Sequence, residues 1–76
     1  MNIKILGSGC PNCRRLETNV KEAAKNLNIE AEFEKVTDMK AIVSYGVMST
    51  PALVVDGKVV SYGRVLSVVE AEKLIK

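Results

Sequence analysis

Apolar positions in this chain follow two spacings, which alternate along its length. Short apolar or alternating runs predict strands over residues 2–6, 30–36, 52–55 and 58–61. Apolar residues three or four positions apart predict helices over residues 11–26 or 27, over about 38–45, and from Ser67 onward. The predicted order is therefore β-α-β-α-β-β-α.

The first and last helices each have a predicted core face. In the first helix it holds Cys13, Leu16, Val20, Ala23, Ala24 and Leu27, and in the last it holds Val68, Ala71, Leu74 and Ile75. Ser67 and Glu70 form a capping box that starts the last helix, with Leu66 stapled onto Ala71. We also expect core packing around the second helix from Met39, Ile42, Val43, Val47 and Met48.

Turn residues fix how these elements connect. Thr37 or Asp38 should cap the second helix and Gly46 should stop it, while Asp56-Gly57 predicts a tight hairpin. A helix joins the first two strands, which must then be parallel, and the hairpin makes the last two antiparallel. Right-handed crossovers place helices on both faces of a four-stranded mixed sheet, an α/β fold. The charged row of Glu30, Glu32 and Glu34 suits an edge strand.

Composition limits the chain to one small domain, residues 1–76. The 76 residues are 47% hydrophobic, enough for one modest core. A net charge of +2, with Lys and Arg scattered among Glu, argues against nucleic acid or a membrane surface as partner. The apolar start is strand-sized, so we expect no membrane span or signal peptide. We therefore expect a monomer in the cytoplasm. In that reducing compartment a close Cys pair is more often catalytic or metal-binding than structural.

The segment Cys10-Pro11-Asn12-Cys13 carries the candidate chemistry. One helical turn brings residues i and i+3 within the range of roughly 7 Å that a disulfide needs between Cα atoms. Cys10 falls at the expected N-cap and Pro11 at the first helical position. The N-H groups and dipole of the helix start favour a thiolate at Cys10, whereas Cys13 belongs to the core face. We therefore expect Cys10 to attack and Cys13 to resolve.

Arg14 and Arg15 follow this segment, in the first helical turn, where cations are normally unfavourable. Their charge would further favour the thiolate and attract acidic surfaces on partners. An ordinary solvated helix face explains the same two residues equally well.

Two other functions fit a C-x-x-C pair. It is also half of a zinc or iron-sulfur site, but the chain has no His and only two Cys, so a thiolate site would need two chains or outside ligands. A purely structural disulfide is less favoured, because so short a loop constrains the unfolded chain little. Redox chemistry, which needs no cofactor, remains the main prediction.

The chain resembles a minimal thioredoxin-fold protein, close to glutaredoxin in size and to the small redox-active disulfide proteins of archaea and bacteria. The likeness covers the whole chain and rests on the Cys10–Cys13 motif, Thr50-Pro51, the Asp56-Gly57 hairpin and Gly63. It implies a cis peptide bond at Thr50-Pro51 and a Thr50 backbone that pairs with an extended substrate segment. It also implies an apolar rim around Cys10 that includes Met48 and Gly63.

The resemblance implies the activity and the site. It predicts a thiol-disulfide oxidoreductase that reduces protein disulfides, with Cys10 and Cys13 catalytic. Its substrate-binding residues would be Gly9, Pro11, Asn12, Thr50, Pro51 and Gly63. The partners would be disulfide-containing proteins and an electron donor resembling thioredoxin reductase.

The chain also departs from its relatives. Thioredoxins carry a buried carboxylate on the strand before the motif, whereas residues 1–10 contain no Asp or Glu and Lys4 falls near that place. Proton transfer from Cys13 must then use water, Lys4 or no special group. Asn12 and the Ser61-to-Arg64 segment replace the glutathione-holding features of glutaredoxins. Use of glutathione is left open, and a protein reductase is the favoured donor.

Overall fold

The computed structural model describes residues 1–7, 9 and 11–75 of the chain, and the order of elements is the predicted one. The elements are β1 (Asn2–Leu6), α1 (Pro11–Asn26), β2 (Glu32–Val36), α2 (Met39–Ser44), β3 (Ala52–Val55), β4 (Lys58–Tyr62) and α3 (Val68–Ile75). β2 begins at Glu32 rather than residue 30, because Glu32 pairs with Asn2, the first residue of β1, and earlier residues have no strand to pair with.

The four strands form one mixed sheet in the order β2-β1-β3-β4. β1 and β2 are parallel, whereas β1 with β3 and β3 with β4 are antiparallel. β2 lies at an edge, as its charged outer row predicted. Asp56 and Gly57 both have positive φ in the β3-β4 hairpin, as a primed two-residue turn requires. The minimal thioredoxin fold expected from the sequence is confirmed.

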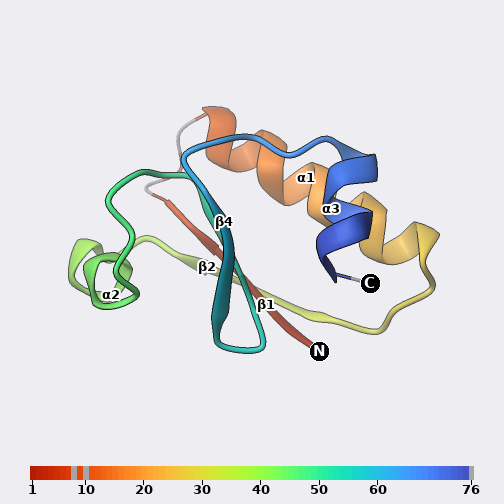
Figure 1. The fold of residues 1–76 in the computed structure, drawn as a ribbon, viewed down its shortest axis with the longest axis horizontal. Coiled ribbons are helices and arrows are strands. Elements are labelled where there is room, and N and C mark those ends of the chain that lie inside the picture. The colour runs from red at the N-terminus through yellow and green to blue at the C-terminus, as the bar shows by residue number, and fades with distance from the viewer. Residues whose placement is uncertain (8, 10, 76) are drawn as a thin grey trace.

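Helices cover both faces of this sheet. α1 and α3 lie side by side on one face, and α2 lies apart from them (Figure 1). Ile42 of α2 packs with residues on the other face of the sheet. The sheet's pleat sends Ile3 and Ile5 into the core under α1 and α3, and Leu6 into the core under α2. Each fully buried Ile or Leu side chain stabilises the fold by about 1.5–3 kcal/mol. β1 therefore packs against both layers, and it ends at Leu6, shortly before α1 begins at Pro11.

The helix boundaries follow the predicted signals. Asp38 caps α2 by accepting a hydrogen bond from the Lys40 backbone N–H at 3.1 Å, and Gly46 follows it with a φ of +77°. Before α3 the Ser67 hydroxyl accepts from the Glu70 N–H at 3.2 Å, and the Glu70 carboxylate accepts from the Ser67 N–H at 3.1 Å. The capping box is therefore formed in both directions.

Some residues predicted for the core are exposed instead. Around α2, Ile42 and Val47 are buried, but the exposed fractions are 62% for Met39, 63% for Val43 and 98% for Met48. α2 has only six residues, so its contact face buries Ile42 and leaves Met39 and Val43 exposed, whereas Met48 lies in the loop after the helix. Leu74 of α3 is 39% exposed, because the buried stripe of that short helix runs through Ala71 and Ile75.

Candidate functional site

The start of α1 places Cys13 at the edge of the core. α1 begins at Pro11, as predicted, and both Pro11 and Asn12 are exposed. Cys13 is 5% exposed, which agrees with its predicted position on the core face. Cys10 lies outside the described residues, so its predicted exposure and N-cap position stay predictions.

Gly7, directly after β1, lies against Cys13. A Cβ built on Gly7 would overlap the Cys13 Sγ and would lie 3.3 Å from the Cys13 Cβ and 3.9 Å from the Thr50 Cβ. The Gly7 N–H donates to the Val36 carbonyl at 2.9 Å, which fixes its backbone to the end of β2. The absence of a side chain at Gly7 lets the Cys13 sulfur and the Thr50 segment approach each other.

The segment before β3 has the predicted conformation. The Thr50-Pro51 peptide bond is cis. Gly63, just after β4, donates its N–H to the Pro51 carbonyl at 2.9 Å and has a φ of +72°. A Cβ on Gly63 would lie 3.1 Å from the Ser49 Cβ, so a larger residue would crowd this segment. The structure therefore brings together Cys13, Thr50, Pro51 and Gly63 from three separate parts of the chain.

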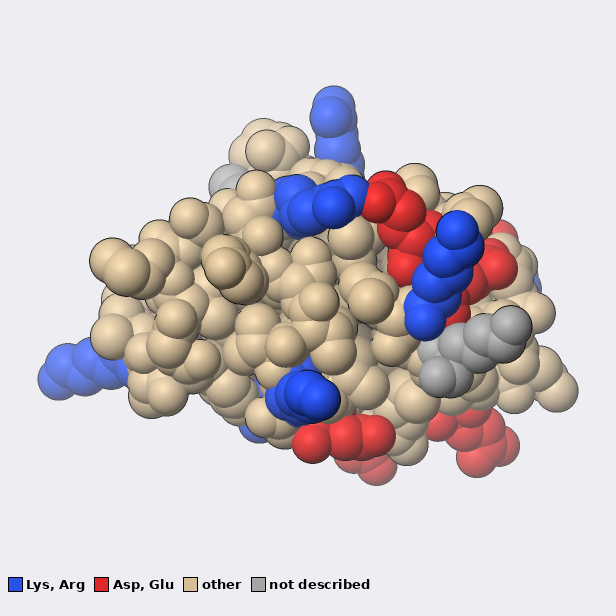
Figure 2. Space-filling view, in the orientation of Figure 1, with Lys and Arg blue, Asp and Glu red and all other residues tan. Residues whose placement is uncertain are grey.

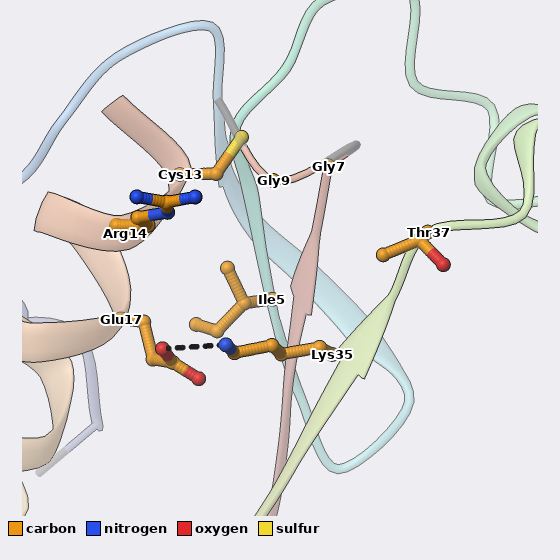
Figure 3. A pocket seen from close by; sticks show the side chains of 8 residues that line it. All are labelled: Ile5, Gly7, Gly9, Cys13, Arg14, Glu17, Lys35 and Thr37. Carbon is orange, nitrogen blue, oxygen red and sulfur yellow. Dashed lines mark ion pairs between the residues drawn. The ribbon is translucent and has the colours of Figure 1, made fainter. Parts of the chain in front are cut away.

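A cavity of about 210 Å³ opens beside Cys13, between α1 and the ends of β1 and β2 (Figure 3). We call it the Cys13 pocket, and its described lining residues are Ile5, Gly7, Gly9, Cys13, Arg14, Glu17, Lys35 and Thr37. Gly9 has a φ of +85°, a backbone conformation that favours glycine. Predicted site residues Gly9 and Cys13 thus share this pocket with charged side chains.

Glu17 and Lys35 are charged residues of this pocket to which the sequence analysis gave no role, and Gly7 is another lining residue that it missed. The Glu17 carboxylate lies 3.2 Å from Lys35 Nζ across the pocket (Figure 3), and its side chain is only 14% exposed. The available signal was the position of Glu17 four residues after Cys13, on the same side of α1. The sequence around Lys35 did not indicate a place at the site, because its contact with Glu17 of α1 depends on how β2 packs against that helix.

Lys4 does not lie beside Cys13, contrary to the expectation for that position. Lys4 Nζ donates to the Tyr45 hydroxyl at 3.0 Å and lies 3.5 Å from the Glu34 carboxylate, which places it under α2. The hydrogen bond to Tyr45 raises the pKa of Lys4 above its ordinary value. Alternation along β1 explains the difference, because Lys4 points to the face opposite Ile3 and Ile5.

A second, larger cavity of about 490 Å³ lies next to Thr50. We call it the Met48 pocket; its described lining residues are Met39, Ile42, Val43, Gly46, Val47, Met48 and Thr50. In the view of Figure 2, the end of the molecule that holds α2 carries few charges, whereas charges gather over α1 and α3. The three exposed apolar side chains around α2 therefore border the segment that carries the cis proline.

Two absences hold for residues 1–7, 9 and 11–75. No group of three or more His, Cys, Asp and Glu side chains there is arranged to hold a metal ion. None of the helices in that part of the chain has the length and apolar character needed to cross a membrane. The expected cytoplasmic location stays a prediction.

Comparison with known proteins identifies the family. A family model described as "Thioredoxin domain" matches residues 1–76. The chain belongs to the thioredoxin family. It is 47% identical over 75 residues to a thioredoxin of Methanothermobacter thermautotrophicus, a match that covers 99% of this chain and 97% of that protein. A thioredoxin of Methanocaldococcus jannaschii is 40% identical over 74 residues, which cover 97% of this chain and 85% of that protein.

Membership of the thioredoxin family assigns thiol-disulfide oxidoreductase chemistry at the level of the family. Disulfide-containing substrates and a reductase as partner follow at the same general level. Within this thioredoxin fold, the buried sulfur of Cys13, the cis proline and the two pockets lie at one end of the sheet.

Proposed function

We propose that the single domain of residues 1–76 reduces protein disulfides through a dithiol-disulfide cycle of Cys10 and Cys13. The observation that carries the proposal is the burial of Cys13 in the first turn of α1, with its sulfur against Gly7 and with Thr50 close to the same glycine. A shielded second thiol suits a resolving role, because it meets a disulfide only once that disulfide is attached to its neighbour.

The proposed cycle has two exchange steps. The Cys10 thiolate attacks one sulfur of the substrate disulfide, and the other substrate sulfur leaves as a thiolate. Cys13 then attacks Cys10 in this mixed disulfide, the Cys10-Cys13 bond forms, and the second substrate sulfur leaves. Two electrons pass from the protein dithiol to the substrate, and a reductase returns them.

Charges at the start of α1 support Cys10 as the attacking thiol. The first-turn N–H groups and the helix dipole stabilise an anion there, and Arg14 and Arg15 add exposed positive charge. In the described first turn α1 has no acidic residue that would oppose this effect.

The segment before β3 supports a mode of substrate binding. Thr50 offers backbone groups beside Cys13, so an extended substrate segment is proposed to pair with it by strand addition. Gly9, Pro11 and Asn12 would flank the reacting sulfurs, while Pro51 and Gly63 hold the Thr50 segment in place.

Trapping of the mixed disulfide tests the assignment of roles. Cys13→Ser should accumulate a covalent complex with a protein disulfide substrate, because the resolving thiol is gone. Cys10→Ser is the matched control and should accumulate none. Trapping by Cys10→Ser alone would reverse the roles. Stoichiometric metal or a visible charge-transfer band in protein purified without oxygen or chelators would contradict the redox function and favour a metal or iron-sulfur half-site in a dimer.

A further inference from the structure

We propose that cations beside Cys13 select disulfide substrates that carry acidic residues next to their disulfide. The inference rests on the proposed function, and it names the class of substrate that the same site prefers. We call Arg14, Arg15 and Lys35 the basic patch. Arg14 and Lys35 line the Cys13 pocket from α1 and from β2 (Figure 3), and Arg15 follows Arg14 on α1 with its side chain exposed.

The nearest carboxylate does not neutralise Arg14. Glu17 follows Arg14 by three residues, a spacing at which opposite charges on a helix usually pair. One oxygen of Glu17 instead lies 3.2 Å from Lys35 Nζ, and the other lies 3.7 Å from Lys21 Nζ. Of the residues that the structure describes, none forms an ion pair with Arg14. The Arg14 guanidinium therefore remains available to a partner.

Arg15 is not neutralised within its helix either. The residues three and four positions further on are Thr18 and Asn19, which carry no charge. Cations at the start of a helix oppose its dipole, so this position lowers the stability of α1. A residue that breaks a local rule without a compensating contact inside the fold points to a functional role. Binding of an anionic group from outside the chain would supply that role.

Positive charge is concentrated around this part of α1. Four cations and one carboxylate lie there, an excess of three positive charges, from Arg14, Arg15, Glu17, Lys21 and Lys35. The whole chain has 11 Lys and Arg and 9 Asp and Glu, so the remaining seven cations and eight carboxylates have a net charge of −1. The small net charge of the chain thus conceals a basic region beside Cys13.

These charges are close enough to act on a bound substrate. Arg14 follows Cys13 directly, and Arg15 lies about 3 Å beyond Cys13 along the helix axis. The Debye length at physiological ionic strength is about 8 Å, so a carboxylate close to the substrate disulfide would be attracted and an ammonium repelled. Such attraction mainly raises the rate of association.

Selection by charge differs from activation of the thiol. Cations near the attacking sulfur favour its thiolate, and that effect speeds the reaction with every disulfide alike. Selection instead changes the ratio of the rates for an acidic and a basic substrate. The ratio therefore reports the proposed role and is independent of how much thiolate is present.

The test uses three peptides that share one sequence around an internal disulfide and differ only in three flanking positions, which hold Asp, Asn or Lys. Excess peptide oxidises the reduced protein in a single turnover, and the loss of protein thiols, read by mass after quenching and alkylation, gives a second-order rate constant. Each constant is divided by that of the same peptide with dithiothreitol, an uncharged dithiol. This division removes differences in reactivity among the peptide disulfides.

In the wild type at about 0.02 M ionic strength, the Asp peptide should react roughly tenfold faster than the Lys peptide, with the Asn peptide between them. The ratio should approach one at about 0.5 M salt, where exposed charges are screened. Arg14→Gln combined with Arg15→Gln should lower the ratio at low salt to less than about threefold. Arg14→Glu combined with Arg15→Glu should invert the order of the Asp and Lys peptides.

Two controls accompany these variants. Lys25→Gln removes a cation from the last turn of the same helix and should leave the ratio as in the wild type. Alkylation by iodoacetamide, an uncharged reagent, follows the thiolate in each protein and separates a change in thiol activation from a change in selection. The Arg variants should fold, because the charges that they remove oppose the helix dipole.

Equal normalised rates for the Asp and Lys peptides in the wild type would overturn this inference, as would an unchanged ratio in the variant that lacks both arginine charges. Either result leaves the two-step exchange intact, since the Asn peptide is still reduced. A dimer found by light scattering at low salt and lost in that variant would assign the basic patch to a second copy of the chain, which also overturns the inference. Failure to reduce any of the three peptides would overturn the proposed function and this inference with it.

Discussion

Gly7 lies directly against Cys13, so closely that a Cβ on Gly7 would overlap the cysteine sulfur. The contact is made at the end of β1, where the backbone of Gly7 is hydrogen-bonded to Val36. A glycine is needed here for space and not for an unusual backbone angle, since its φ lies outside the positive region. The position of the Cys13 sulfur therefore depends on a missing side chain.

Gly7→Ala should destabilise the reduced protein by about 1–3 kcal/mol, because it overpacks a buried contact. The cost should fall in a Cys13→Ala background, from which the sulfur has been removed. Urea unfolding of the four proteins of this double-mutant cycle measures the coupling. An equal cost of Gly7→Ala in both backgrounds would show that the sulfur is not what Gly7 accommodates.

Met48 should contribute to the binding of protein substrates, because its side chain is 98% exposed beside Thr50. Met48→Ser should lower kcat/KM for a protein disulfide about fivefold to tenfold, or about 1 kcal/mol of lost apolar contact. Stability and the reduction of a small aromatic disulfide should change little.

Val69→Ser is the matched control, since Val69 is also exposed but lies on α3, outside the Met48 pocket. It should leave both substrates unaffected. If Met48→Ser reduces the protein disulfide as fast as the wild type, the Met48 pocket takes no part in substrate binding.

The capping box before α3 should make stability depend on pH. The backbone hydrogen bond from Ser67, followed by the Ser67 hydroxyl and Arg64, lowers the pKa of Glu70 below its ordinary value of 4.5. A carboxyl whose pKa is lower in the folded state stabilises the fold above its unfolded pKa. That contribution is lost as the pH falls through the folded pKa.

Glu70→Gln should therefore be less stable than the wild type at neutral pH, and the difference should vanish in acid, well below pH 4.5. Ser67→Ala, which removes the cap, should cost about 1 kcal/mol. Thermal unfolding measured from neutral pH down to well below pH 4.5, with Glu22→Gln as control, measures both effects. A difference for Glu70→Gln that persists at the lowest pH would contradict the linkage.

Local sequence signals predicted most of the fold. The spacing of apolar residues identified α1 and its buried face, and the Ser67-Glu70 pair identified the start of α3. These features depend on residues within one or two turns of each other, so the sequence carries them directly. The cis bond at Pro51 came from the family resemblance, because the residues alone give no such preference.

Features that depend on the packing of distant segments were not predicted. Lys35 meets Glu17 because the parallel register of β1 and β2 turns Lys35 to the face that α1 covers. The same alternation takes Lys4 to the opposite face, away from Cys13. Met39, Val43 and Met48 were expected inside because apolar residues usually are. The short α2 has too little contact area to bury Met39 and Val43, and Met48 lies in the loop that follows α2.

An equilibrium redox titration against a dithiol buffer, with the protein thiols counted at each potential, tests the central claim most directly. The account predicts that two thiols disappear together in one two-electron transition, and that Cys10→Ser and Cys13→Ser each abolish it. Protein that keeps both thiols under oxidising conditions, or forms only disulfides between chains, would contradict the Cys10-Cys13 cycle.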